Sequence, residues 1–142
     1  MNEFQAALGS LQLKYIDEAI LRRRQIDTYY REALVDIPGI SILPLPEGSD
    51  HNYSYFPILV EQDFSLSRDE LYQKFKDNDI FVRRYFYPLI SQFPMYRGLS
   101  SAATKNLPVA SLISNKVICL PIYPDLLDDD VELVVSIIKS VI

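Results

Sequence analysis

Residues 53–87 read YSYFPILVEQDFSLSRDELYQKFKDNDIFVRRYFY and predict a strand over 53–61, a helix over 67–78 and a second strand over 80–87. Apolar and polar side chains alternate in the first strand, as they do when one face of a strand is buried. Pro57 has no N–H to donate to a neighbouring strand. We therefore expect this strand to lie at a sheet edge or to carry a bulge at the proline.

The start of the central helix has a signature of its own. Ser67 and Glu70 have the spacing of a capping box, in which each side chain accepts a hydrogen bond from the other residue's backbone N–H. The helix is therefore expected to begin here and to bury Leu71 and Phe75 on one face.

The flanking sequence predicts further elements on both sides. Apolar residues at helical spacing predict one long helix over residues 2–37, which a Pro-Gly pair ends. Short strands are expected over 40–45 and 117–120, where prolines close apolar runs. Three aspartates at 128–130 predict the N-cap and the charged first turn of a final helix.

Residues 88–116 are expected to be irregular, with one helical turn near 107–113. A connection of this length without regular structure is uncommon in a compact domain. The segment is therefore expected either to carry function or to pack on something.

Helices and strands in this order predict an α/β fold of the α+β sandwich type, in which helices cover a small, mostly antiparallel sheet. A chain of 142 residues is expected to form a single domain over 1–142, with the long helix followed by a body over 40–142. The net charge of −5 argues against non-specific nucleic-acid binding. Because no apolar run approaches the ~20 residues that span a bilayer, and no signal peptide is evident, we expect a cytoplasmic protein without a membrane segment.

Several charged or reactive side chains have two interpretations each. The acidic run 125–130 is better explained as a helix start than as a metal site, and Arg22–Arg24 as a solvated helix face than as a phosphate patch. Cys119 lies between apolar neighbours and is expected to be a small buried hydrophobe rather than a nucleophile. His51 is either a hydrogen-bonded turn residue or a group at the rim of a substrate site.

The segment 82–89, VRRYFYPL, carries the strongest functional signal. Arg83 and Arg84 can bind phosphate or carboxylate in a bidentate manner, and Tyr85 and Tyr87 offer flat rings with hydroxyl tips. This combination suits an anionic, polyhydroxylated ligand such as a nucleotide-linked sugar. An edge strand with exposed charged residues explains the same pattern equally well.

Three stretches in order resemble one known family. MNEFQAALG at 1–9, RRYFYPL at 83–89 and CLPIYPDL at 119–126 are similar to segments of the DegT/DnrJ/EryC1/StrS family of pyridoxal-phosphate-dependent nucleotide-sugar aminotransferases. The resemblance implies the small carboxy-terminal domain of a fold-type I transferase, in a homodimer that serves surface-polysaccharide or antibiotic sugar biosynthesis.

The same resemblance implies that the large domain, which carries the Schiff-base lysine, precedes Met1. None of the six lysines here matches the family's cofactor motif: Lys14, Lys74, Lys76, Lys105, Lys116 and Lys139. We therefore expect these 142 residues alone to hold no pyridoxal 5'-phosphate and to have no catalytic residue or activity.

For the intact enzyme, the resemblance implies an exchange between an amino donor, such as glutamate, and a keto-deoxysugar linked to dTDP. It places Arg84, Tyr85 and Tyr87 near the sugar or diphosphate and His51 at the rim of the site. Asn2 lies close to the segment that contacts the cofactor phosphate in the family.

An alternative from another class is a free-standing, non-catalytic protein-interaction module. Ten Tyr and seven Phe in this chain would then form its aromatic binding surface. A domain separated from a larger enzyme also exposes apolar surface. We expect self-association through the first helix and the loop 85–97.

Overall fold

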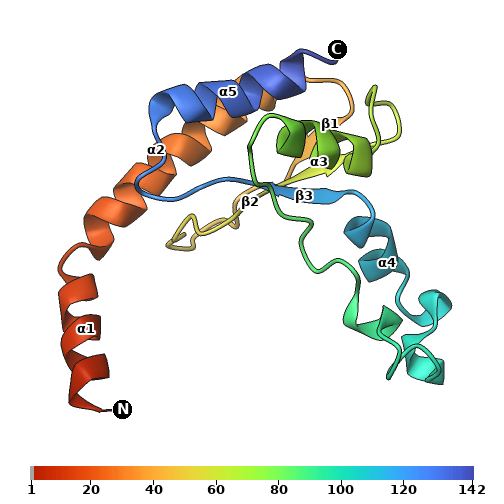
Figure 1. Ribbon diagram of the computed structural model, residues 1–142, viewed down its shortest axis with the longest axis horizontal. Coiled ribbons are helices and arrows are strands. Elements are labelled where there is room, and N and C mark those ends of the chain that lie inside the picture. The colour runs from red at the N-terminus through yellow and green to blue at the C-terminus, as the bar shows by residue number, and fades with distance from the viewer. Residues whose placement is uncertain (1) are drawn as a thin grey trace.

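The computed structural model describes residues 2–142 (Figure 1). The described residues form five α-helices and three short strands, and three 3₁₀ turns lie between residues 90 and 106. The elements in chain order are α1 (Glu3–Leu13), α2 (Ile16–Leu34), β1 (Ile40–Ile42), β2 (Phe56–Val60), α3 (Arg68–Asp77), α4 (Pro108–Ser114), β3 (Val117–Leu120) and α5 (Asp128–Lys139).

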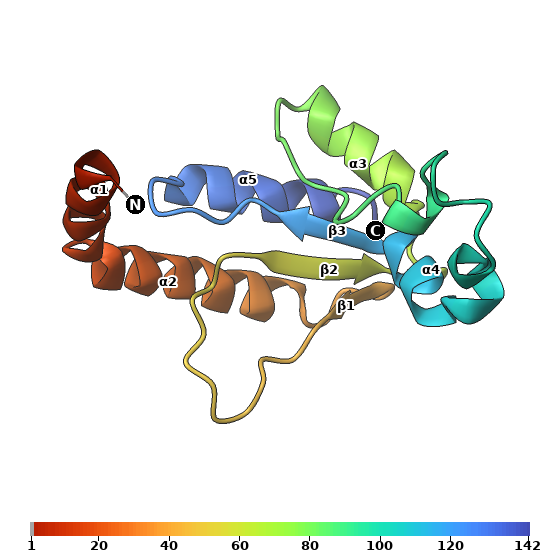
Figure 2. The ribbon, with the colours of Figure 1, turned by 90° about the horizontal axis from the view of Figure 1, so that it is seen from below.

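The core lies between the sheet and helices α2, α3 and α5 (Figures 1 and 2). Tyr30 of α2 is fully buried, packs on Phe56 with ring centroids 5.0 Å apart, and donates a hydrogen bond of 3.0 Å to the carbonyl of Pro121. Burial raises the pKa of the Tyr30 phenol far above its usual value. The α+β architecture with an antiparallel sheet is confirmed.

The sheet has the order β1-β2-β3, so the expected edge position of the strand that contains Pro57 is wrong. Pro57 stands opposite Cys119, whose N–H and C=O both bond to Arg83 on the far side. The nitrogen of Pro57 therefore points toward β1, which ends at Ile42, opposite Ile58. The missing N–H costs no ladder hydrogen bond because β1 has already ended at that level.

The expected single helix over 2–37 is two helices, and the second ends at Leu34. Tyr15, at the junction, has φ −113° and ψ 3°, outside the α-helical region. No residue of α1 is buried, whereas Ile26, Tyr30 and Leu34 of α2 pack into the core. Because nothing in the body holds α1 in line with α2, the two helices diverge at the junction (Figure 2).

The strand expected over 80–87 is reduced to one isolated bridge between Arg83 and Cys119. The two residues exchange backbone hydrogen bonds of 3.1 and 2.7 Å. Asp79 and Phe86 have φ values of 59° and 49°, in the left-handed region, so the chain turns on both sides of the bridge. Extended backbone is therefore confined to a short stretch beside β3.

Two other helix starts are now defined. The capping box of α3 is confirmed, with both the Ser67 and Glu70 hydrogen bonds present. The N-cap of α5 is Leu127 rather than an aspartate, and Asp128 to Asp130 occupy the first turn, where their charge favours the helix dipole. Arg22 is half-buried and lies 2.8 Å from Asp128, and Arg23 is half-buried as well. The expected solvated face of Arg22–Arg24 is therefore wrong at its first two residues, and only Arg24 is exposed.

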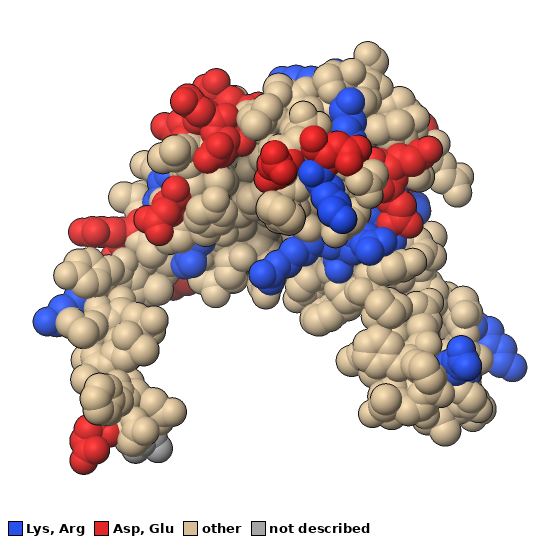
Figure 3. Space-filling view, in the orientation of Figure 1, with Lys and Arg blue, Asp and Glu red and all other residues tan. Residues whose placement is uncertain are grey.

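The molecule has the outline of an arch (Figure 1). Helix α1 forms one leg and residues 88–114 form the other, ending in α4, which confirms the helical turn expected near 107–113. Both legs carry few charged side chains (Figure 3). Their exposed apolar residues include Phe4, Leu8, Leu11 and Leu13 on the first leg and Ile90, Met95, Leu99, Val109 and Leu112 on the second. Within the described residues, every helix is too short or too polar to cross a lipid bilayer.

Candidate functional site

The face of the sheet turned away from α2 and α5 carries the candidate site. Because side chains alternate along a strand, Phe56 and Ile58 enter the core while Pro57 lies on the other face. In Figure 1 this second face looks into the space between the two legs. Aromatic and basic side chains gather at its β3 end, where Arg83 extends the sheet by one bridge.

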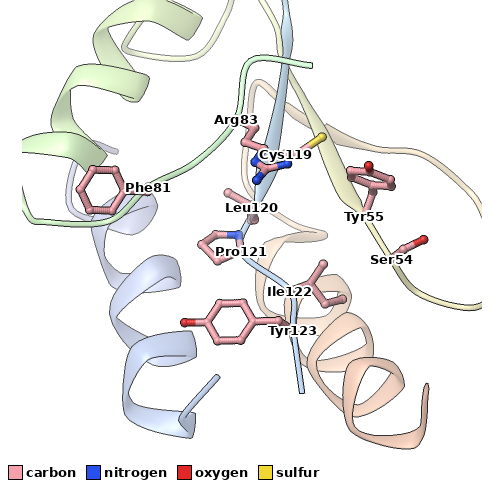
Figure 4. A pocket seen from close by; sticks show the side chains of 9 residues that line it. All are labelled: Ser54, Tyr55, Phe81, Arg83, Cys119, Leu120, Pro121, Ile122 and Tyr123. Atoms are coloured by element: carbon pink, nitrogen blue, oxygen red, sulfur yellow. The ribbon is translucent and has the colours of Figure 1, made fainter. Parts of the chain in front are cut away.

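A first pocket of about 390 Å³ lies along this edge (Figure 4). Residues from three segments form its wall: those just before β2, the bridge segment, and the end of β3 with the chain that follows it. The lining residues are Ser54, Tyr55, Phe81, Arg83, Cys119, Leu120, Pro121, Ile122 and Tyr123.

A second pocket of about 220 Å³ adjoins the first. The two share Ser54, Tyr55 and Cys119, and the second adds His51, Pro57 and Tyr85. The rings of Tyr55 and Tyr85 lie 5.2 Å apart at a tilt of 59°, a favourable aromatic geometry. Together the pockets form one open surface with aromatic walls.

The guanidinium of Arg83 supplies the charge of this surface. Arg83 is exposed, and among residues 2–142 no carboxylate lies within ion-pair distance of it. Burial raises the pKa of the adjacent Cys119 thiol to about 11, and the charge of Arg83 opposes that rise. Cys119 is therefore a neutral thiol at pH 7. With the exposed charge of Arg83 and the aromatic rings beside it, the surface suits a ligand that has an anionic group attached to a ring.

Two of the candidate residues from the sequence meet at the second pocket. Tyr85 lines it through its ring, and His51 lines it from the loop between β1 and β2. His51 is also a hydrogen-bonded turn residue, because its Nδ1 accepts the backbone N–H of Tyr53 at 3.0 Å. Both interpretations of His51 therefore remain compatible with its position.

Arg84 and Tyr87 lie apart from the pockets and pack against α3. Arg84 donates a hydrogen bond of 3.2 Å to Asp69, and its guanidinium carbon lies 4.5 Å from the ring centroid of Tyr72. The ring of Tyr87 lies 4.6 Å from the same guanidinium. These two side chains are engaged with protein groups on the opposite side of the segment from Tyr85.

Asn2 lies at the far end of the molecule, at the N-terminus of α1 (Figure 1). Its side chain accepts the backbone N–H of Gln5 at 2.9 Å, and the Gln5 side chain accepts the N–H of Asn2 at 3.1 Å. Asn2 is therefore the N-cap of α1.

Sequence reasoning missed Tyr55 as a lining residue, and it named Arg83 and Arg84 together as anion-binding groups without separating them. The signal that separates the two arginines is the two-residue period of extended chain, because Arg83 and Tyr85 must lie on one side and Arg84 on the other. The acidic run 125–130 shows no ligand arrangement: within the described part of the chain, no three His, Cys, Asp or Glu side chains come together as a metal site would require.

The chain is similar in sequence to known transaminases over nearly its whole length. A dTDP-4-amino-4,6-dideoxy-D-glucose transaminase of Escherichia coli is 51% identical over 139 residues, which are 98% of this chain and 37% of that protein. A transaminase of the same name from Shigella dysenteriae is 46% identical over 99% of this chain and 38% of its own length. The chain thus spans little more than a third of the curated relatives that it matches, as a small domain does.

Two solved structures also match nearly the whole chain with about a third of their own length. DesI, crystallised in the presence of its TDP-sugar product, superposes with a TM-score of 0.88 at 28% identity, over 99% of this chain and 35% of that one. DesV of S. venezuelae, solved in complex with a ketimine intermediate, superposes with a TM-score of 0.86 at 26% identity, over 99% and 36%. Residues 1–139 match the DegT/DnrJ/EryC1/StrS aminotransferase family, and the chain belongs to that family.

Proposed function

We propose that this chain is the carboxy-terminal small domain of a pyridoxal-phosphate-dependent aminotransferase that acts on a dTDP-linked keto-deoxysugar. The observation that carries the proposal is the 51% identity, across nearly the whole chain, with a transaminase named for a dTDP-amino sugar. The pocketed face with Arg83 supports it, because a sugar nucleotide has the anionic and ring groups that this face suits. Such an enzyme serves polysaccharide or antibiotic sugar biosynthesis in the cytoplasm.

In the proposed reaction, the amino group of glutamate replaces the keto oxygen of the sugar. Glutamate becomes 2-oxoglutarate, so each sugar that gains nitrogen leaves one keto acid behind. Pyridoxal phosphate, when bound to such an enzyme, supplies the aldehyde that carries the amino group between the two substrates.

The described residues do not by themselves fit that cofactor. Lys116 is paired with Glu61 at 2.5 Å, and neither pocket of the candidate site has a lysine in its lining. A covalent link to the cofactor therefore requires a lysine from outside this surface. We propose that a large amino-terminal domain supplies it, that the enzyme is a homodimer, and that the 142 residues alone are inactive.

The proposed role of this chain is substrate placement. The guanidinium of Arg83 would bind the diphosphate, with Tyr85 and His51 lining the slot beside it. Arg84 and Tyr87 stay candidates for the same substrate, although both already contact α3. Asn2 stays a candidate for the neighbourhood of the cofactor phosphate, with its side chain engaged in capping α1.

A turnover assay tests the proposal. The product of the complete reading frame that contains this chain would be incubated with glutamate and dTDP-4-keto-6-deoxyglucose, and release of 2-oxoglutarate would be followed. We expect release that depends on the sugar nucleotide, and none from residues 1–142 alone. Release from the short chain, or none from the complete protein, would refute the proposal.

A further inference from the structure

Five side chains join the first turns of α3 to the segment 84–87. Asp69 is the centre of this cluster: its Oδ1 lies 2.9 Å from Nε of Arg68 and 3.2 Å from Nη1 of Arg84. One carboxylate oxygen therefore contacts a cation on the helix and a cation on the segment that leads to Tyr85. Of the two contacts, only that with Arg84 is a hydrogen bond, because Nε of Arg68 has no hydrogen-bond partner among the described residues. The carboxylate therefore ties Arg84 to α3 and lies beside Arg68 as a counter-charge.

The ring of Tyr87 contacts the same two arginines. The guanidinium carbons of Arg68 and Arg84 are each 4.6 Å from its centroid, within the range of cation–π attraction. Arg84 also lies 4.5 Å from the ring of Tyr72, one helical turn after Arg68. The two ends of the segment, Arg84 and Tyr87, are therefore both held against α3.

Arg68 ties this cluster to the body of the molecule. Its side chain is only 3% exposed, and its Nη1 donates to the carbonyl oxygens of Ser114 at 3.0 Å and Val117 at 3.3 Å. These carbonyls lie at the end of α4 and the start of β3. A buried guanidinium bonded to two fixed carbonyls has little freedom to move, so the cluster rests on a rigid base.

Tyr85 and Phe86 form the tip between the two held residues. Tyr85 turns to the opposite side and lines the second pocket against Tyr55. Arg83, just before the held stretch, is bonded through its backbone to Cys119. The position of Tyr85 therefore depends on the contacts of Arg84 and Tyr87 with α3, and neither of these two residues lines the pockets.

We propose that Asp69, supported by Arg68, is a positioning residue that clamps residues 84–87 and thereby sets Tyr85 and Arg83 for the sugar nucleotide. The expected effect of Asp69 on catalysis rests on the proposed function, whereas the clamp is a set of contacts within the chain and does not depend on it. Asp69 is 57% exposed, so its substitution opens no cavity in the core, although it removes the carboxylate beside the buried Arg68. This makes it a better probe than the buried Arg68.

The experiment compares Asp69→Ala with two further variants of the complete protein. Asp69→Glu keeps the carboxylate, and Asp129→Ala removes an exposed aspartate from the first turn of α5, far from the clamp. Hydrogen–deuterium exchange of residues 83–90 and steady-state kinetics with dTDP-4-keto-6-deoxyglucose are measured for each. In Asp69→Ala we expect exchange to rise about three- to fivefold in that segment, as loss of a partly exposed ion-pair network predicts.

The kinetic expectation is a rise in KM for the sugar nucleotide of about fivefold with kcat changed less than about twofold, because placement rather than chemistry is disturbed. Asp69→Glu should recover most of both effects, and Asp129→Ala should show neither. Unchanged exchange over 83–90 would overturn the clamp. Raised exchange with an unaltered KM would overturn the positioning role. A wild-type protein that does not turn over the sugar would refute the proposed function, and the exchange comparison would still decide the clamp.

Discussion

Arg83 and Arg84 are adjacent in sequence but have different surroundings. Arg84 is paired with Asp69 and stacked on two tyrosines, whereas Arg83 is exposed at a pocket with no acidic partner among residues 2–142. A cation without an internal partner is the better candidate for an external anion, since binding does not first have to break an ion pair.

Substitution of Arg83 tests this assignment. In the complete enzyme, Arg83→Gln should lower kcat/KM for the sugar nucleotide by about 10- to 100-fold, the effect of losing a hydrogen bond to a charged group. Arg24→Gln, on the exposed outer side of α2, serves as the matched control and should change kcat/KM less than about twofold. Equal kinetics for Arg83→Gln and the control would remove Arg83 from the site.

Tyr87 offers a second test at this scale. Two guanidiniums, those of Arg68 and Arg84, lie against its ring, so the ring rather than the hydroxyl accounts for these contacts. Tyr87→Phe should therefore keep kcat/KM within about twofold, while Tyr87→Ala should lower it several-fold through the loss of both cation–π contacts. If Tyr87→Phe is as damaging as Tyr87→Ala in the turnover assay, the hydroxyl itself contacts the substrate.

At the same scale, the sequence indicated the segment that lines the surface but did not separate Arg83 from Arg84. The motif at 82–89 does line the surface through Arg83 and Tyr85. The two-residue alternation of extended chain contained the information that Arg83 shares a side with Tyr85. The partner of Arg84 could not be predicted, because Asp69 is fifteen residues away and meets it only after α3 has packed on the sheet.

Two helices begin with a capping box, and their contributions to stability should differ. Helix α3 buries Leu71 and Phe75, whereas α1 buries nothing. Ser67→Ala should therefore lower the free energy of unfolding of the 142-residue chain by about 1 kcal/mol, and Asn2→Ala should leave it unchanged. Urea denaturation followed by circular dichroism measures both, and a cost at Asn2 equal to that at Ser67 would show that α1 is part of the cooperative unit.

Elements with local signals were predicted, and those that depend on packing were not. The capping box gave the start of α3, and apolar runs gave β1, β2 and β3, although the first two are shorter than expected. No glycine or proline marks the break between α1 and α2 at Tyr15. The break could not be predicted from the sequence because it reflects the absence of a core contact for α1. Pro57 suggested an edge strand, since the sequence does not show that β1 ends one residue short of it.

The whole molecule is an arch whose two legs expose apolar side chains with few charges between them (Figure 3). Contiguous exposed apolar surface of this kind favours association. We expect the 142-residue chain to self-associate at high concentration, and Phe4→Ser with Leu8→Ser to weaken that association. Sedimentation velocity over a concentration series measures it, with Val35→Ser, an exposed apolar residue outside the legs, as the control. A monomer at every concentration would contradict this expectation.

The central claim is that this chain is the small domain of an enzyme that moves nitrogen onto a nucleotide-linked sugar. Its most direct test is the transfer of ¹⁵N from labelled glutamate to dTDP-4-keto-6-deoxyglucose by the complete protein, read by mass spectrometry of the product. We predict a ¹⁵N-labelled dTDP-amino sugar from the complete protein and none from residues 1–142. An unlabelled, unchanged sugar, under conditions in which the Escherichia coli relative transfers the label, would contradict the account.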